Sequence, residues 1–155
     1  MMKGNDVAVE HFVQQSMVAR IATLSHNGRP SITPLYFVTM KDHIWLGTAD
    51  WTLAAREVKD NPYVSVLFQM ERNSVDRRIL RLTGSAKICT DAKIVRASNL
   101  RMALKYILSP GGIRNHLVHF RLLPLNRLYH MQSAEKGAAC IIDFMPEQCA
   151  FLDDC

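Results

Sequence analysis

The sequence predicts a mainly β domain, with five or six antiparallel strands that form a small closed or split barrel and short helices at its corners. Runs of alternating apolar and polar residues, separated by short turns rich in Gly, Asn, Asp and Pro, predict the strands. Stretches with helical spacing of apolar residues predict the helices between them. The expected strands are 19–25, 31–39, 43–47, 63–70, 77–89 and 117–131.

The length and composition of the chain fit one domain. With 155 residues, of which 48% are hydrophobic, the chain can bury a core without disulfides or metals. It contains no apolar run of about 18 residues, and its N-terminus has no apolar signal core. We therefore expect a single domain over 1–155, no membrane insertion and a cytoplasmic location.

The charged residues and the cysteines exclude little by themselves. A net charge of +5 favours anionic ligands, but the positive residues are spread along the chain and 147–155 is acidic, so nucleic acid is an unlikely partner. The cysteines show no CxxC spacing, which predicts reduced thiols and no structural metal. They are Cys89, Cys140, Cys149 and Cys155.

The first part of the chain predicts a helix followed by a meander of three strands. Residues 6–17 carry apolar side chains at helical spacing. The pair Asn27-Gly28 predicts a tight hairpin turn in which both residues have positive φ. The polar turn at 40–42 then leads into the third strand.

The second part predicts two more helices and a bend. Residues 48–62 predict a short helix that ends at Asn61-Pro62. In the strand 77–89, Gly84 lies where a bulge or a barrel bend is expected. The longest helix is expected at 91–108, with one apolar and one solvated side, and no periodicity is found in 133–155, which is expected to be an irregular tail. The apolar side is Ile94, Val95, Leu104, Ile107 and Leu108, and the solvated residues are Lys93, Arg96, Arg101 and Lys105.

The order of several short motifs carries a family resemblance. ARIATLS, an Asn-Gly turn, GRPSITPLYF, a strand ending in Gly-Thr, a short helix, DNPYVSVLF and a strand with LTGSA follow one another. This order resembles the pyridoxamine 5'-phosphate oxidase-like flavoproteins with the FMN-binding split barrel. The resemblance covers 18–89 well, is weaker at FRLLPLNRLYHM and is absent from the tail.

The resemblance implies that the strand after the first turn runs beside the flavin of a bound FMN. The residues concerned are Ile32, Thr33, Pro34 and Leu35. A proline gives up a backbone donor, which is tolerable where no ladder bond is required. An ordinary edge strand or a bulge would explain Pro34 equally well.

The start of the short helix offers groups that suit the phosphate. A phosphate monoester favours cationic groups, hydroxyl donors and the free amides at a helix start. Thr48 and Thr52 match the family's hydroxyl residues, and Arg56 lies one turn past Thr52. The alternative is that Thr52 only caps the helix and that Arg56 is solvated.

The resemblance also brings neighbouring positions into the cofactor site, and one of them departs from the family pattern. Gly47 and Leu53 complete the implied set together with Ala54, where many relatives have a phosphate-binding lysine. Arg56 could compensate for the missing lysine. Three further arginines could reach in from a neighbouring strand or subunit, namely Arg20, Arg78 and Arg81.

The residues that could contact the flavin ring could equally belong to the hydrophobic core or the surface. Flavin sites combine an apolar wall with a few amide contacts. Candidates are Leu35, Tyr36, Leu46 and Trp51 for the wall and Gln69 for an amide. Hydride transfer to and from a flavin requires no side-chain nucleophile, so no catalytic residue is assigned. His116-x-x-His119 lacks a third metal ligand at suitable spacing.

The resemblance further implies a homodimer with cofactor at the subunit interface. Apolar strand residues that we expect to be exposed, Val64, Val66 and Phe68, fit this arrangement. The expected function is an FMN-dependent oxidoreductase with a small-molecule substrate. The alternatives are a deazaflavin- or haem-binding relative, and a non-enzymatic flavin-binding module or basic nucleic-acid domain.

Overall fold

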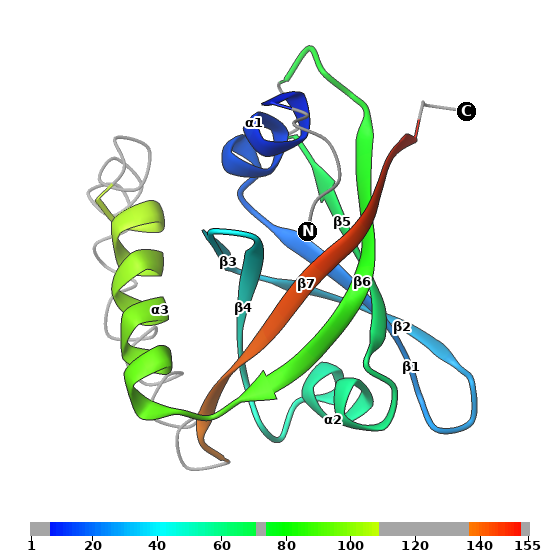
Figure 1. Cartoon of the computed structure of the whole chain (residues 1–155), viewed down its shortest axis with the longest axis vertical. Coiled ribbons are helices and arrows are strands. Elements are labelled where there is room, and N and C mark those ends of the chain that lie inside the picture. Colours follow the sequence, from blue (N-terminus) through cyan, green and yellow to red (C-terminus); the bar gives the residue numbers. More distant parts are fainter. Residues whose placement is uncertain (1–6, 71–73, 109–136, 153–155) are drawn as a thin grey trace, which may run out of the picture.

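A computed structural model describes residues 7–70, 74–108 and 137–152 as a curled antiparallel sheet of seven strands with three helices (Figure 1). The strand order is β2-β1-β5-β6-β7-β4-β3. The elements are α1 (Val7–Gln15), β1 (Ala19–Leu24), β2 (Pro30–Leu35), β3 (Phe37–Met40), β4 (His43–Ala49), α2 (Leu53–Asp60), β5 (Tyr63–Gln69), β6 (Ile79–Cys89), α3 (Ala92–Tyr106) and β7 (Ala139–Leu152).

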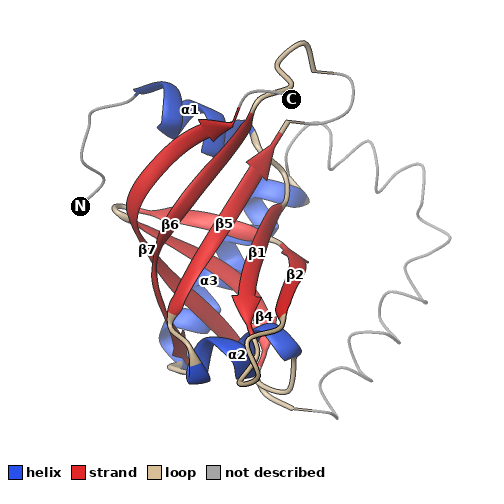
Figure 2. Ribbon diagram, turned by 90° about the vertical axis from the view of Figure 1, so that its right-hand side faces the viewer, coloured by secondary structure: helices blue, strands red, loops and turns tan. Residues whose placement is uncertain are grey.

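The sheet curls because its two edge strands are neighbours in the chain. β2 and β3 form opposite edges of the sheet, yet only Tyr36 separates them. The Gly47 amide donates a hydrogen bond to the Tyr36 carbonyl oxygen (2.9 Å), which holds this crossing against β4. Figure 2 shows the resulting half-barrel. The predicted meander is therefore wrong, since the run 31–39 splits at Tyr36 and its halves pair with β1 and β4 respectively.

The first hairpin turn differs from the expected one. The Ser25 amide donates to the Arg29 carbonyl (2.9 Å) and the Gly28 amide to the Ser25 carbonyl (2.8 Å), which closes a three-residue loop. Within this loop Gly28 has a positive φ, at 73°, and Asn27 does not. This is the common type I turn followed by a left-handed glycine, rather than a two-residue turn with two left-handed residues.

Two predictions about the later strands have different outcomes. The bulge at Gly84 is confirmed, because the register between β6 and β7 shifts between Thr83 and Gly84. The irregular tail is wrong for 139–152, since β7 pairs with β6 on one side and with β4 on the other. The strand expected at 117–131 lies outside the described residues.

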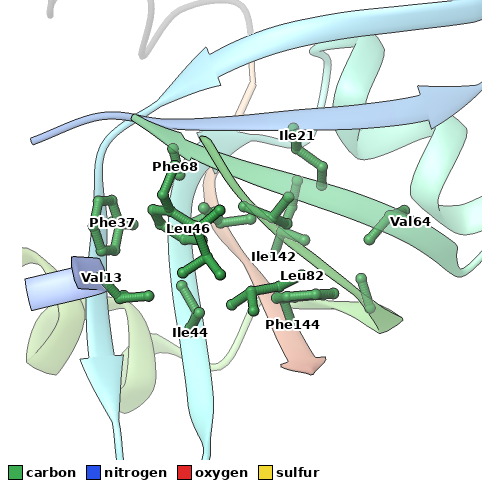
Figure 3. Packing of buried hydrophobic residues seen from close by; sticks show 14 of the residues in the cluster. Val13, Ile21, Phe37, Ile44, Leu46, Val64, Phe68, Leu82, Ile142 and Phe144 are labelled. Carbon is green, nitrogen blue, oxygen red and sulfur yellow. The ribbon is translucent and has the colours of Figure 1, made fainter. Parts of the chain in front are cut away.

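The core lies inside the curl and is closed by a helix at each end (Figure 3). α1 contributes Phe12 and Val13, and α2 contributes Ala54 and Val58. The apolar side chains of β5 that we expected to be exposed are buried, because they alternate toward this core. They are Val64 (4% exposed), Val66 (0%) and Phe68 (0%).

α3 packs beside β3, β4 and β7 on the outside of the sheet (Figure 1). Its expected sides are partly wrong, because Leu104 is exposed whereas Lys105 is partly buried over the Phe37 ring. The exposed Ile107 and Leu108 follow the helix end. Among the described helices, none is long and apolar enough to cross a bilayer.

Candidate cofactor-binding site

The junction between β4 and α2 is built around a threonine cap. Thr52 has extended backbone (φ −68°, ψ 154°), and its hydroxyl oxygen accepts a hydrogen bond from the Ala55 amide (3.3 Å). The same hydroxyl donates to the Ala49 carbonyl (2.8 Å). The capping interpretation of Thr52 is therefore confirmed, and it fixes where the helix begins.

The hydroxyl of Thr48 contacts the capping hydroxyl of Thr52. The oxygen atoms of Thr48 and Thr52 are 2.8 Å apart. Because the only hydroxyl proton of Thr52 points to Ala49, Thr48 is the donor in this pair. The cap itself does not use the Thr48 proton, because its two bonds run from Thr52 to Ala49 and from Ala55 to Thr52.

The first turn of α2 adds amides and a guanidinium. The amides of Leu53 and Ala54 precede the first intrahelical bond and have no acceptor among the described residues. Arg56 is exposed and lies one turn after Thr52, on the same side of the helix. Ala54 is fully buried, so any part that it plays falls to its amide. Leu53 is 49% exposed beside it.

The carboxyl groups nearest in sequence point elsewhere. A side chain at Gly137 would clash with the Asp50 carboxyl group, so Asp50 lies against the start of the C-terminal segment. Glu57 lies on the buried side of α2. The exposed front of the α2 start thus combines hydroxyl, amide and guanidinium donors, the set that a phosphate requires.

The strand β2 lies next to this junction. Ser31 donates a hydrogen bond to Glu57 of α2 (2.5 Å), and Thr23 of β1 donates to the same carboxyl oxygen (2.5 Å). Because Thr23 and Ser31 face each other across the hairpin, the cluster ties α2 to both strands. These hydrogen bonds hold β2, which we expect to line the flavin ring, beside α2, which we expect to bind the phosphate.

Within β2, alternate residues differ in exposure. Ile32 (62% exposed) and Pro34 face outward, while Thr33 and Leu35 are half-buried. Pro34 pairs with Arg20 of β1, and the other side of β2 is a sheet edge. An edge position is sufficient to explain the proline, and it also leaves that side of the strand open to a ligand or a second chain.

The three other candidate arginines make their described contacts away from the start of α2. Arg78 is bound to Asp76 (2.8 Å) and stacks on Phe151 (4.5 Å to the ring centroid). Arg20 and Arg81 flank Leu67 across β5 on the outer face of the sheet. No described contact brings these three arginines to Thr48 or Thr52.

Among the ring-wall candidates, Leu46 is a core residue and Gln69 is exposed. Tyr36 (61% exposed), Trp51 (41%) and the half-buried Leu35 remain accessible. His116 and His119 lie outside the described residues.

Comparison with known proteins identifies the family. Residues 6–151 match the family model for pyridoxamine 5'-phosphate oxidase. The chain belongs to the pyridoxamine 5'-phosphate oxidase-like family. Its curled sheet is the split barrel of that family, so the predicted fold class is confirmed. No curated protein sequence matches the chain.

Several solved structures share the fold of this chain at low sequence identity. A conserved hypothetical protein from Mycobacterium tuberculosis is 16% identical with a TM-score of 0.70, covering 98% of this chain and 86% of its own. The haem storage protein HutZ from Vibrio cholerae is 17% identical with a TM-score of 0.65, covering 95% and 92%. An F420 reductase is 18% identical with a TM-score of 0.63, covering 91% and 94%. At this identity the likeness concerns the fold alone.

Sequence reasoning missed one residue that shapes the site. Glu57 is 4% exposed and joins α2 to the hairpin. Its spacing contained the signal, since Glu57 lies three residues after Ala54 and next to Val58, on the buried side of the helix. A buried carboxyl group needs hydrogen-bond donors, and Thr23 and Ser31 supply them.

Proposed function

We propose that this member of the pyridoxamine 5'-phosphate oxidase-like family binds FMN, with the phosphate at the start of α2, and acts as an oxidoreductase on a small molecule. The observation that supports this most is the pair of hydroxyls of Thr48 and Thr52, 2.8 Å apart, in front of the free amides of α2. Arg56 supplies the charge one turn further on.

The residues of the chain have binding and positioning roles in this proposal. Thr48, Arg56 and the amides of Leu53 and Ala54 hold the phosphate, and Gly47 shapes the end of β4 beside them. Ile32, Thr33, Pro34 and Leu35 line the cofactor along the open edge of β2. The flavin supplies the hydride chemistry when bound, so no side chain is assigned a catalytic role.

A homodimer is part of the proposal. Exposed apolar side chains lie on the β1–β2 hairpin, at the residue between β2 and β3, and at the start of α2, on or next to the elements of the candidate site. They include Leu24 (40% exposed), Ile32 (62%), Tyr36 (61%) and Leu53 (49%). Such side chains favour burial against a second chain. Light scattering should give twice the mass of one chain, and Ile32→Lys should shift the protein toward the monomer.

The phosphate contact is tested by comparing FMN with riboflavin, which lacks the phosphate. Arg56→Ala should weaken FMN binding about 10- to 100-fold, because a hydrogen bond between charged groups contributes about 1.5–3 kcal/mol. Riboflavin binding should change less than threefold. Arg96→Ala, an exposed arginine on α3, is the matched control and should change neither affinity. Equal losses for FMN and riboflavin would show that Arg56 does not contact the phosphate.

A second candidate function is binding of a deazaflavin or haem. The buried Ala54, in place of the family's lysine, favours it, as do the relatives named F420 reductase and HutZ. The absorbance spectrum of the purified protein separates the three cofactors. A flavin that stays bound without turnover with any reductant would favour the non-enzymatic module. Salt-sensitive binding of random DNA by a colourless protein would favour the nucleic-acid domain.

A further inference from the structure

A groove between α1, β3 and α3 lies apart from the candidate cofactor site. It has a volume of about 410 Å³, and its lining residues are Gln14, Val38, Thr39, Arg101, Leu104 and Lys105. None of them belongs to the junction of β4 and α2, and α1 and α2 lie at opposite ends of the sheet (Figure 1). The volume falls within the range of small-molecule sites, which is roughly 300–1,000 Å³.

The lining has the chemistry of an anion site. Among the described lining residues, all four polar side chains can donate hydrogen bonds, two of them are cationic, and none carries a carboxyl group. Val38, which is 5% exposed, and Leu104 add an apolar surface. The nearest acidic group on α1 is Glu10, which accepts a hydrogen bond from the Gln14 amide (3.4 Å).

Lys105 is partly buried in this groove, so its ammonium group loses part of its hydration. Its Nζ atom lies 3.4 Å from the centroid of the Phe37 ring and 5.2 Å from that of Tyr106. Burial lowers the pKa of Lys105 to about 8. Within the described ranges, no carboxylate lies at ion-pair distance from Lys105 or Arg101. A half-buried cation of this kind is stabilised by any anion that reaches it.

We propose that this groove binds a small organic carboxylate, whose anionic group contacts Arg101 and Lys105 and whose apolar body lies on Val38 and Leu104. The guanidinium of Arg101 matches the planar carboxylate in geometry, and the ammonium of Lys105 adds a point charge. The site is separate from the FMN site and does not depend on it.

The test uses the full chain with benzoate and with benzamide, a neutral compound of the same size, in calorimetric titrations at pH 7. Benzoate should bind at least tenfold more tightly than benzamide. Lys105→Met should weaken benzoate binding at least tenfold, Lys105→Arg should restore it to within threefold, and Arg101→Gln should weaken it at least fivefold. Lys93→Met, an exposed lysine in the first turn of the same helix, should leave it unchanged.

Several results would overturn the proposal. These are no measurable benzoate binding, equal binding of benzoate and benzamide, and unchanged benzoate binding in Lys105→Met. Thermal unfolding of each variant identifies loss of fold. If Lys105→Met does not fold, Arg101→Gln decides, because Arg101 is exposed on the helix surface; unchanged benzoate binding in that variant would equally reject the site.

Discussion

The hydrogen bonds of Glu57 should contribute measurably to stability, because they join a helix to a hairpin far away in the sequence. Thr23 and Ser31 each donate to one Glu57 oxygen at 2.5 Å. Their own oxygens are 3.0 Å apart, and since both hydroxyl protons point to Glu57, that contact adds no third hydrogen bond. The perturbation is Thr23→Val, which keeps the shape of the side chain and removes one donor.

The expected magnitude follows from the burial of the cluster. Thr23 is 2% exposed and Glu57 4%, so water does not replace the lost donor. Loss of one hydrogen bond to a buried acceptor costs about 1–3 kcal/mol, depending on the charge of the acceptor. We expect Thr23→Val to lower the free energy of unfolding by about 2 kcal/mol. Thr39→Val, on the exposed edge strand β3, is the matched control and should change it by less than about 0.5 kcal/mol.

The assay is urea denaturation of the two variants, of Glu57→Gln and of the double variant Thr23→Val with Glu57→Gln. If the two groups interact, the double variant loses less than the sum of the single losses, with a coupling of about 0.5–3 kcal/mol. Additive losses, or a Thr23→Val loss no larger than that of Thr39→Val, would refute the reasoning.

Three further predictions concern the charge of Lys105, the charge of Tyr106 and the backbone at Gly84. The pKa of Lys105 is about 8 in the folded protein, against an ordinary value of 10.5. Between these pH values the unfolded chain binds more protons than the folded one, so the free energy of unfolding should rise with pH. After allowance for solvent screening, we expect a rise of about 1 kcal/mol over this window. Lys105→Met should remove the rise in pH-dependent urea unfolding, whereas an unchanged profile would assign it to another group. Burial raises the pKa of Tyr106 to about 12, so stability should fall again above about pH 10. Gly84→Ala should lower the free energy of unfolding by more than about 2 kcal/mol in thermal unfolding, since the added Cβ would meet the backbone of Met145. Gly28→Ala is the control: its Cβ would meet no atom within 4 Å, and the positive φ alone should cost about 1 kcal/mol. Equal losses in the two variants would contradict the packing argument.

The local elements of this fold could be predicted from the sequence, whereas the order of the strands in the sheet could not. Alternation and turn residues located β1, β5, β6 and both described short helices, because these signals act within a few residues. Each half of the run that splits at Tyr36 pairs with its neighbour in the chain, but β5, β6 and β7 lie between the two hairpins in the sheet, and no local pattern contains that long-range order. β7 escaped prediction because its apolar and polar residues do not alternate regularly, being buried in succession at Cys140, Ile141 and Ile142.

The candidate site divides in the same way. The cap at Thr52 and the exposed Arg56 follow from helix spacing, which sequence contains. The proton arrangement between Thr48 and Thr52 and the tie through Glu57 depend on three-dimensional contacts. Lys105 illustrates the limit most clearly, because a lysine among charged neighbours was expected in solvent and instead lies over an aromatic ring.

The position of β7 also has a consequence for synthesis on the ribosome. β7 is the only strand that joins β6 to β4 in the described sheet, and it lies near the C-terminus. Until it emerges from the exit tunnel, both strands keep an unpaired edge, and such edges can pair with other nascent chains. β7 is the last of the described strands in chain order, so the two halves of the sheet can be joined only after β7 has left the tunnel.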